Sequence, residues 1–184
     1  MSKQLYIIAL VPHEKLRDDI SELKLEMKER FNASHALKAP AHITLQMPFR
    51  RDEEFEETLT AGLDSFTAGQ QPFEIEINGF DAFPPRVLFL KIDNHSPVVE
   101  LHSDLQPVLR ENLGLSDKEI MDRFHPHLTI ATRDLSKKMF NKAWPEFKER
   151  KFRASFTADR LHLLKHNGKN WDLYREFLFD NIES

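Results

Sequence analysis

The feature that most constrains the fold of this chain is an order of predicted elements that occurs twice: helix, strand, helix, strand, strand. An apolar run of strand length at residues 6–11 precedes the first copy. Apolar residues at helical or strand spacing predict the elements of the first copy at residues 14–31, 42–47, 55–66, 73–77 and 87–92. Those of the second are predicted at 98–109, 127–131, 139–147, 152–157 and 161–165, with a last strand at 171–179. The repeat predicts an α+β fold with internal pseudo-symmetry.

The length of 184 residues suits one domain that buries a sizeable core. No segment rich in Gly, Ser or Pro separates the two copies. We therefore expect residues 1–184 to form a single domain, with two lobes built approximately from the repeats at 1–93 and 94–184.

Composition excludes several classes of protein. The chain has no cysteine, so disulfides, cysteine–zinc sites and thiol nucleophiles are excluded. The sequence contains no run of 18 apolar residues, which a membrane-spanning helix would need. Residues 1–5 lack the apolar stretch of a signal peptide, so we expect a cytoplasmic protein. The net charge of −4 argues against a protein that coats long nucleic acid, which needs a basic surface. The charge does not exclude binding of a short phosphate-bearing ligand in a local cleft.

Two tetrads of the same form lie on predicted strands at equivalent places in the two copies. They are His42-Ile43-Thr44-Leu45 and His127-Leu128-Thr129-Ile130. Residues two apart on a strand point to the same face, so each tetrad presents an imidazole beside a hydroxyl and buries its apolar residues. Roughly 0.3 His-x-Thr matches are expected by chance in this composition, so a matched pair is informative.

Two imidazoles suit phosphoryl transfer by acid–base catalysis, because histidine titrates near neutral pH. One neutral imidazole takes a proton from the attacking group, and one protonated imidazole gives a proton to the leaving oxygen. The hydroxyls of Thr44 and Thr129 suit binding of the non-bridging phosphate oxygens.

The tetrads have three other interpretations. In the first, the histidines are structural strand residues whose hydrogen bonds are made within the fold. In the second, they bind a metal with Asp122 and Asp134, and in the third they belong to a serine hydrolase. Two imidazoles and two hydroxyls make a poor zinc site, and no Gly-x-Ser-x-Gly segment is present. We expect neither a metal nor a cofactor.

At these residues the sequence resembles the 2H phosphoesterase superfamily, which is named for paired His-x-Ser/Thr tetrads. Within it, the chain is similar to the bacterial and archaeal 2′-5′ RNA ligases, also called RNA 2′,3′-cyclic phosphodiesterases. The matching segments are Ile7–Leu10, Ala41–Leu45, Gly79-Phe80 with Phe83–Phe89, and Pro126–Ile130. The likeness covers nearly the whole chain.

The resemblance implies a bilobal fold in which two small antiparallel sheets line a central cleft, with helices outside. It implies hydrolysis of a 2′,3′-cyclic phosphate at RNA ends or on small nucleotides to a 2′-phosphate, or reversible 2′-5′ ligation. By carry-over, His42 is the general acid and His127 the base, and the two exchange roles in the reverse direction. We expect the protein to act as a monomer.

The chain departs from the family after each tetrad. Where many relatives have a Phe-Leu-Gly-like stretch, this chain has Gln46–Arg50. Where many place an arginine five residues after the second histidine, this chain has Thr132, followed by Arg133. Arg133 is a candidate contact for substrate. Phe49 and Phe83 are candidates to stack on a base, although core packing is the favoured interpretation for both rings in a chain with fifteen Phe.

Other functions remain open at this point. One is a module that binds phosphorylated nucleotides or RNA ends without catalysis. The others keep the enzyme and change its substrate to a 2′-5′ oligonucleotide, an ADP-ribose cyclic phosphate, or an RNA 3′ end that is removed exonucleolytically.

Overall fold

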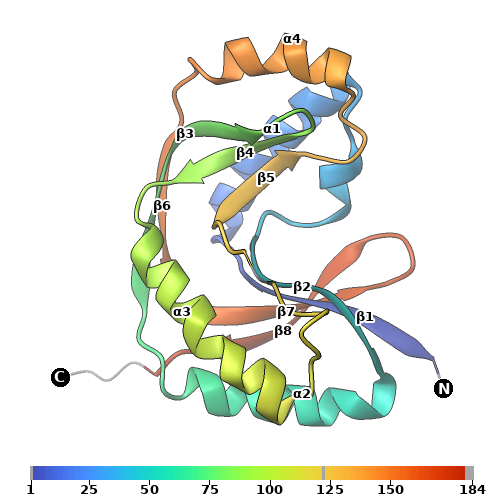
Figure 1. The fold of residues 1–184 in the computed structure, drawn as a ribbon. Coiled ribbons are helices and arrows are strands. Elements are labelled where there is room, and N and C mark those ends of the chain that lie inside the picture. The colour runs from blue at the N-terminus through green and yellow to red at the C-terminus, as the bar shows by residue number, and fades with distance from the viewer. Residues whose placement is uncertain (1, 122, 181–184) are drawn as a thin grey trace.

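The computed structural model describes residues 2–121 and 123–180, which form two four-stranded antiparallel sheets with helices outside them (Figure 1). The first sheet has the order β2-β1-β7-β8 and the second β5-β4-β3-β6. The strands are β1 (Lys3–Leu10), β2 (Ile43–Asp52), β3 (Phe73–Phe83), β4 (Val87–Ile92), β5 (His127–Ala131), β6 (Arg153–Ala158), β7 (Arg160–His166) and β8 (Trp171–Leu178). This architecture confirms the predicted α+β class.

The helices pack in two groups, one with each sheet. Their bounds are α1 (Glu14–Phe31), α2 (Glu56–Thr67), α3 (His95–Pro107) and α4 (Lys137–Phe147), with short turns η1 (His35–Lys38), η2 (Glu53–Phe55) and η3 (Val108–Asn112). Helix α1 contacts β5 and α4 in the upper half of Figure 1, and α2 contacts β8 and η3 in the lower half. None of the helices in the described ranges is long and apolar enough to cross a membrane.

The two halves of the sequence do not each build one lobe. The first half contributes β1 and β2 to one sheet and β3 and β4 to the other, and the second half is divided in the same way. Each lobe therefore contains strands from both repeats, which differs from the expected division at residues 93 and 94. The difference arises because β4 pairs with β5, and β7 with β1, across the repeat boundary.

The two tetrad strands hold equivalent positions in the two sheets. Each is an edge strand that pairs on one side, β2 with β1 and β5 with β4. In both cases a helix connects the paired strands, so β1-α1-β2 and β4-α3-β5 are matching units. The two edge strands also contact each other. The pseudo-symmetry thus brings the tetrads together at the junction of the two sheets.

The predicted elements agree with the structure except in detail. The strand predicted at residues 73–77 continues to Phe83, and Pro145 lies inside α4 without ending it. Helix α1 buries Leu16, Ile20, Leu23, Met27 and Phe31, which are the apolar residues whose spacing predicted it.

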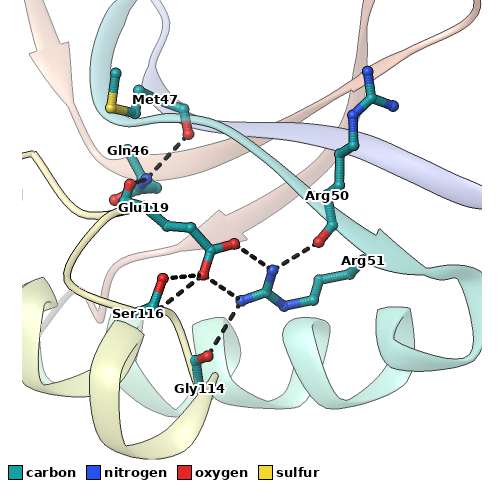
Figure 2. A network of polar contacts seen from close by, with 7 residues as sticks. All are labelled: Gln46, Met47, Arg50, Arg51, Gly114, Ser116 and Glu119. Atoms are coloured by element: carbon teal, nitrogen blue, oxygen red, sulfur yellow. Dashed lines mark hydrogen bonds and ion pairs between the residues drawn. The ribbon is translucent and has the colours of Figure 1, made fainter.

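A polar network joins the end of β2 to the segment between η3 and β5 (Figure 2). Arg51 donates to the Glu119 carboxylate at 2.6 Å and to the Gly114 carbonyl at 3.3 Å. The amide of Gln46, which is fully buried, donates to the backbone carbonyl of Glu119 at 2.7 Å. Hydrogen bonds from Arg51 and Ser116 lower the pKa of Glu119 to about 2. The network therefore links the segment that precedes the second tetrad to β2, the strand that carries the first tetrad.

The depressed pKa of Glu119 makes this contribution to stability dependent on pH. A carboxyl whose pKa is lower in the folded state stabilises the fold above its unfolded pKa, and that contribution is lost as pH falls toward the folded pKa. We expect Glu119→Gln to lower the free energy of unfolding at pH 7 by about 1–2 kcal/mol, allowing for solvent screening. The difference from the wild type should shrink between about pH 4.5 and pH 3.

Urea unfolding followed by circular dichroism at pH 7, 4 and 3 measures this difference. Glu54→Gln, which replaces an exposed acid of η2, is the control and should change stability by less than about 0.5 kcal/mol. A Glu119→Gln deficit that is the same at pH 3 as at pH 7 would contradict the assigned role of the carboxylate.

Candidate functional site

Each tetrad alternates between half-buried polar residues and fully buried apolar ones. Ile43 and Leu45 are fully buried, as are Leu128 and Ile130. The histidine and threonine of each tetrad are half-buried. Because β2 and β5 are edge strands in contact, the half-buried faces meet at one place. His42 itself precedes the first residue of β2, whereas His127 is the first residue of β5.

A backbone carbonyl two residues earlier fixes each imidazole. Nδ1 of His42 lies 2.7 Å from the carbonyl oxygen of Pro40, and Nδ1 of His127 lies 2.6 Å from that of His125. A carbonyl oxygen only accepts hydrogen bonds, so Nδ1 carries the proton in both rings. The neutral rings therefore hold their lone pairs on Nε2, which is the nitrogen left free to exchange a proton with a ligand.

Burial and neighbouring positive charge favour the neutral form of both imidazoles. Burial lowers the pKa of His42 to about 4, and the charges of Lys24 and His127 act in the same direction. Burial also lowers the pKa of His127, and the charge of His125 adds to the effect. Each pKa lies below the value of about 6.5 for a free imidazole, so the unliganded site is neutral at these rings at pH 7.

The tetrads border a cavity of about 640 Å³, a volume within the range of small-molecule sites. His42, Thr44 and Thr129 line it, so residues from both sheets contribute. The lining also includes four cationic residues, Lys24, Lys38, Arg133 and Lys169, and large apolar side chains, among them Leu5, Ile7 and Trp171. None of the described residues that line it is an aspartate or a glutamate. In a chain of net charge −4, this concentration of positive charge indicates an anionic ligand.

Arg133 enters the cavity from the turn after β5. Its φ of 57° lies in the left-handed region, which few residues other than glycine adopt. The next residue, Asp134, accepts hydrogen bonds from the backbone N–H groups of Ser34 and His35. The turn is thereby held against η1, and the arginine considered as a substrate contact lies in the same cavity as the tetrads.

The two phenylalanines considered for base stacking lie in different surroundings. Phe49 is 2% exposed and packs on Tyr6 with ring centroids 5.9 Å apart, so it belongs to the core and offers no face to a ligand. Phe83 is 39% exposed and meets His127 edge-on, with centroids 5.2 Å apart. Phe83 therefore remains a candidate contact beside the second tetrad.

The metal alternative involves Asp122 and Asp134. Asp122 lies outside the described residues, and Asp134 is engaged with the backbone of η1. Within residues 2–121 and 123–180, no three or more His, Asp or Glu side chains cluster as metal ligands.

Comparison with known proteins identifies the family. The family model described as the 2′-5′ RNA ligase superfamily matches residues 12–170, which contain both tetrads. The chain belongs to this superfamily. A Geobacillus kaustophilus protein named "Putative phosphoesterase GK0864" is 28% identical over 183 residues, covering 97% of this chain and 98% of its own. A Halalkalibacterium halodurans protein, "Putative phosphoesterase BH1439", is 29% identical over 177 residues, covering 94% and 95%.

Two solved structures share the fold. Escherichia coli LigT in complex with 3′-AMP superposes with a TM-score of 0.69 at 15% identity, over 98% of this chain and 100% of that one. TT0787 of Thermus thermophilus gives 0.67 at 21% identity, over 96% and 97%. The 2H resemblance read from the tetrads is confirmed, as is the predicted pair of antiparallel sheets.

Most residues of the cavity were not predicted from the sequence, among them Trp171 and Lys24. Trp171 was assigned only as the start of a strand, although it packs against a small apolar cluster that includes Ile7. Lys24 was not singled out, yet it follows Ile20 by four residues and precedes Met27 by three, on the stripe that helix α1 buries. A lysine on a buried stripe was the available signal.

The hydrogen bonds at Nδ1 predict the tautomers of individual histidines. When their imidazole rings are neutral, His42 and His127 should carry the proton on Nδ1. His13 is an internal control, because its Nδ1 accepts from the backbone N–H of Leu16 and its proton must lie on Nε2. Two-dimensional ¹⁵N NMR of the imidazole rings distinguishes the two forms. An Nε2–H signal from His42 or His127 would show that the carbonyls do not orient the rings as described.

Proposed function

We propose that this protein is a phosphoesterase that opens 2′,3′-cyclic phosphates at RNA ends or on small nucleotides, giving a 2′-phosphate, and that it also catalyses reversible 2′-5′ ligation. The observation that carries the proposal is the meeting of two equivalent His-x-Thr segments where β2 contacts β5. His42, Thr44 and Thr129 line one cationic cavity there, His127 is near enough for its charge to act on His42, and a carbonyl holds Nδ1 of each ring. Family membership supports the general chemistry.

In the proposed hydrolysis, a water oxygen forms a bond to phosphorus as the bond from phosphorus to O3′ breaks. Nε2 of His127 takes a proton from the water, and protonated His42 gives a proton to O3′. A 3′-hydroxyl and a 2′-phosphate result, and the proton gained by His127 returns to His42 through solvent. Ligation runs the same steps with a ribose 5′-hydroxyl in place of water, so its oxygen bonds to phosphorus as the bond to O3′ breaks, and a 2′-5′ linkage with a free 3′-hydroxyl results. Cleavage of that linkage is the reverse reaction, in which the two histidines exchange roles.

The remaining contacts suit a nucleotide. The hydroxyls of Thr44 and Thr129 hold two non-bridging oxygens, which keeps the attacking and leaving oxygens in line. Leu5, Ile7 and Trp171 give the nucleoside an apolar surface, and Arg133 provides a further cation. One chain supplies all of these groups, which supports a site that is complete in a monomer.

Turnover in the presence of EDTA tests the proposal. We expect the pure protein to convert 2′,3′-cyclic nucleotides to 2′-nucleotides, resolved by chromatography. His42→Ala and His127→Ala should each lower the rate by about 10²–10⁴-fold, because each removes one proton-transfer group. Thr44→Val should lower it about tenfold or more, through one lost hydrogen bond to a charged oxygen.

His95→Ala, outside the tetrads, is the control for the two catalytic replacements. Binding without turnover on a panel of cyclic nucleotides, 2′-5′ dinucleotides, ADP-ribose cyclic phosphate and RNA 3′ ends would favour the non-catalytic module. Turnover that survives either alanine replacement would refute the acid–base pair.

The lowered pKa values predict an acidic optimum. The reaction needs one imidazole protonated and one neutral, and both groups have pKa values below 6.5 in the free protein. The singly protonated fraction therefore falls as pH rises above about 6.5, and kcat/KM, which reports the free enzyme, should fall with it. Steady-state rates from about pH 4.5 to 8.5 measure the profile. A kcat/KM that is constant or rising between about pH 6.5 and 8 would contradict the assignment.

A further inference from the structure

Lys24 is a buried cation beside the first tetrad. Its side chain on α1 is only 3% exposed, yet it lines the cavity. Nζ donates one hydrogen bond, to the carbonyl oxygen of Ala39 at 2.9 Å. An ammonium group has three donor hydrogens, so a single carbonyl leaves the group incompletely solvated.

Nothing in the described surroundings compensates this charge. Burial lowers the pKa of Lys24 to about 8, and no carboxylate among the described residues contributes to that pKa. The other charged or titratable side chains that line the cavity are those of His35, Lys38, His42, Arg133, His166 and Lys169, and no aspartate or glutamate among the described residues lines it. A buried, unpaired charge is costly to a fold, and the cost falls when an anion arrives as its partner.

The position of Lys24 also couples it to His42. The Ala39 carbonyl that it binds immediately precedes Pro40, whose carbonyl holds Nδ1 of His42. The two groups are close enough that the charge of Lys24 acts on the imidazole. Lys24 therefore lies on the His42 side of the cavity, next to the place where the proposed mechanism puts the phosphate.

We propose that Lys24 is a substrate-binding residue whose ammonium group pairs with a phosphate oxygen on the His42 side of the cavity. The inference rests on the proposed function, in that the ligand carries phosphate. The cyclic diester is a monoanion and the 2′-phosphate product is a dianion at neutral pH. A fixed buried cation consequently interacts more strongly with the phosphoryl group as the ring opens, which favours the transition state over the substrate.

The same anion completes the acid–base pair. Without ligand, burial and Lys24 disfavour protonation of His42. A phosphate that pairs with Lys24 neutralises that charge and places negative charge beside the imidazole, so the pKa of His42 rises on binding. Burial and, to a lesser degree, Lys24 would thus keep His42 neutral in the empty site at pH 7, and bound phosphate would favour its protonation.

Binding of inorganic phosphate tests the inference without requiring turnover. Lys24→Met keeps the length of the side chain and removes its charge. Lys28→Met is the matched control, since Lys28 lies one turn later on the same helix and is exposed. By isothermal titration calorimetry at low ionic strength, we expect Lys24→Met to weaken phosphate binding about ten- to a hundredfold, and Lys28→Met to change it less than about twofold.

A wild-type affinity in folded Lys24→Met would overturn the inference and leave Lys24 as a structural residue that holds Ala39. If Lys24→Met does not fold, ¹³C NMR of labelled lysines in the wild-type protein decides: phosphate should raise the pKa of Lys24 and leave that of Lys28 unchanged. If phosphate leaves the pKa of Lys24 unchanged, the inference is overturned as well. Absence of turnover on cyclic nucleotides, with phosphate binding lost in Lys24→Met, would refute the proposed reaction but not this site.

Discussion

The contact between the edge strands β2 and β5 is the constraint on which the site depends. Each strand has only one hydrogen-bonded neighbour among the described residues, so its outer edge is free to meet the other sheet. The alternation of side chains then decides what enters the cavity: Thr44 and Thr129 line it, and Leu45 and Leu128 are buried. A shift of one residue in either strand would exchange these two sets. The hydrophobic pattern of each tetrad therefore holds its polar residues in place.

Local backbone geometry sets the chemistry of the imidazoles, and long-range packing sets their charge. Each histidine is oriented by the backbone carbonyl two residues earlier in the sequence, so the same hydrogen bond occurs in both repeats. The pKa values depend on burial and on neighbours from elsewhere in the chain, such as Lys24 for His42. The two tetrads are therefore alike in tautomer and differ in electrostatic environment.

Sequence patterns predicted most of the elements, because apolar spacing depends on local burial. The pairing of β7 with β1 was not predictable, since partner choice depends on contacts distant in the sequence. Among candidate site residues, the tetrads were found through their repetition. Phe49 lies in the core, as the favoured interpretation had it, on the face of β2 that also buries Ile43 and Leu45. Lys24 was overlooked because a charged residue on an apolar stripe draws attention only once the stripe is known to border a cavity.

The interleaving of the strands has a consequence for how the chain reaches its native state. The sheet that begins with β1 is completed only by β7 and β8, which follow the whole of the other sheet in the sequence. A chain growing from a ribosome must keep β1 and β2 as an incomplete sheet until those strands emerge. Pairings so distant in sequence raise the contact order, which slows folding. All strands of the second sheet precede β7, so that sheet can pair first, and the sheet that begins with β1 should gain its final structure last.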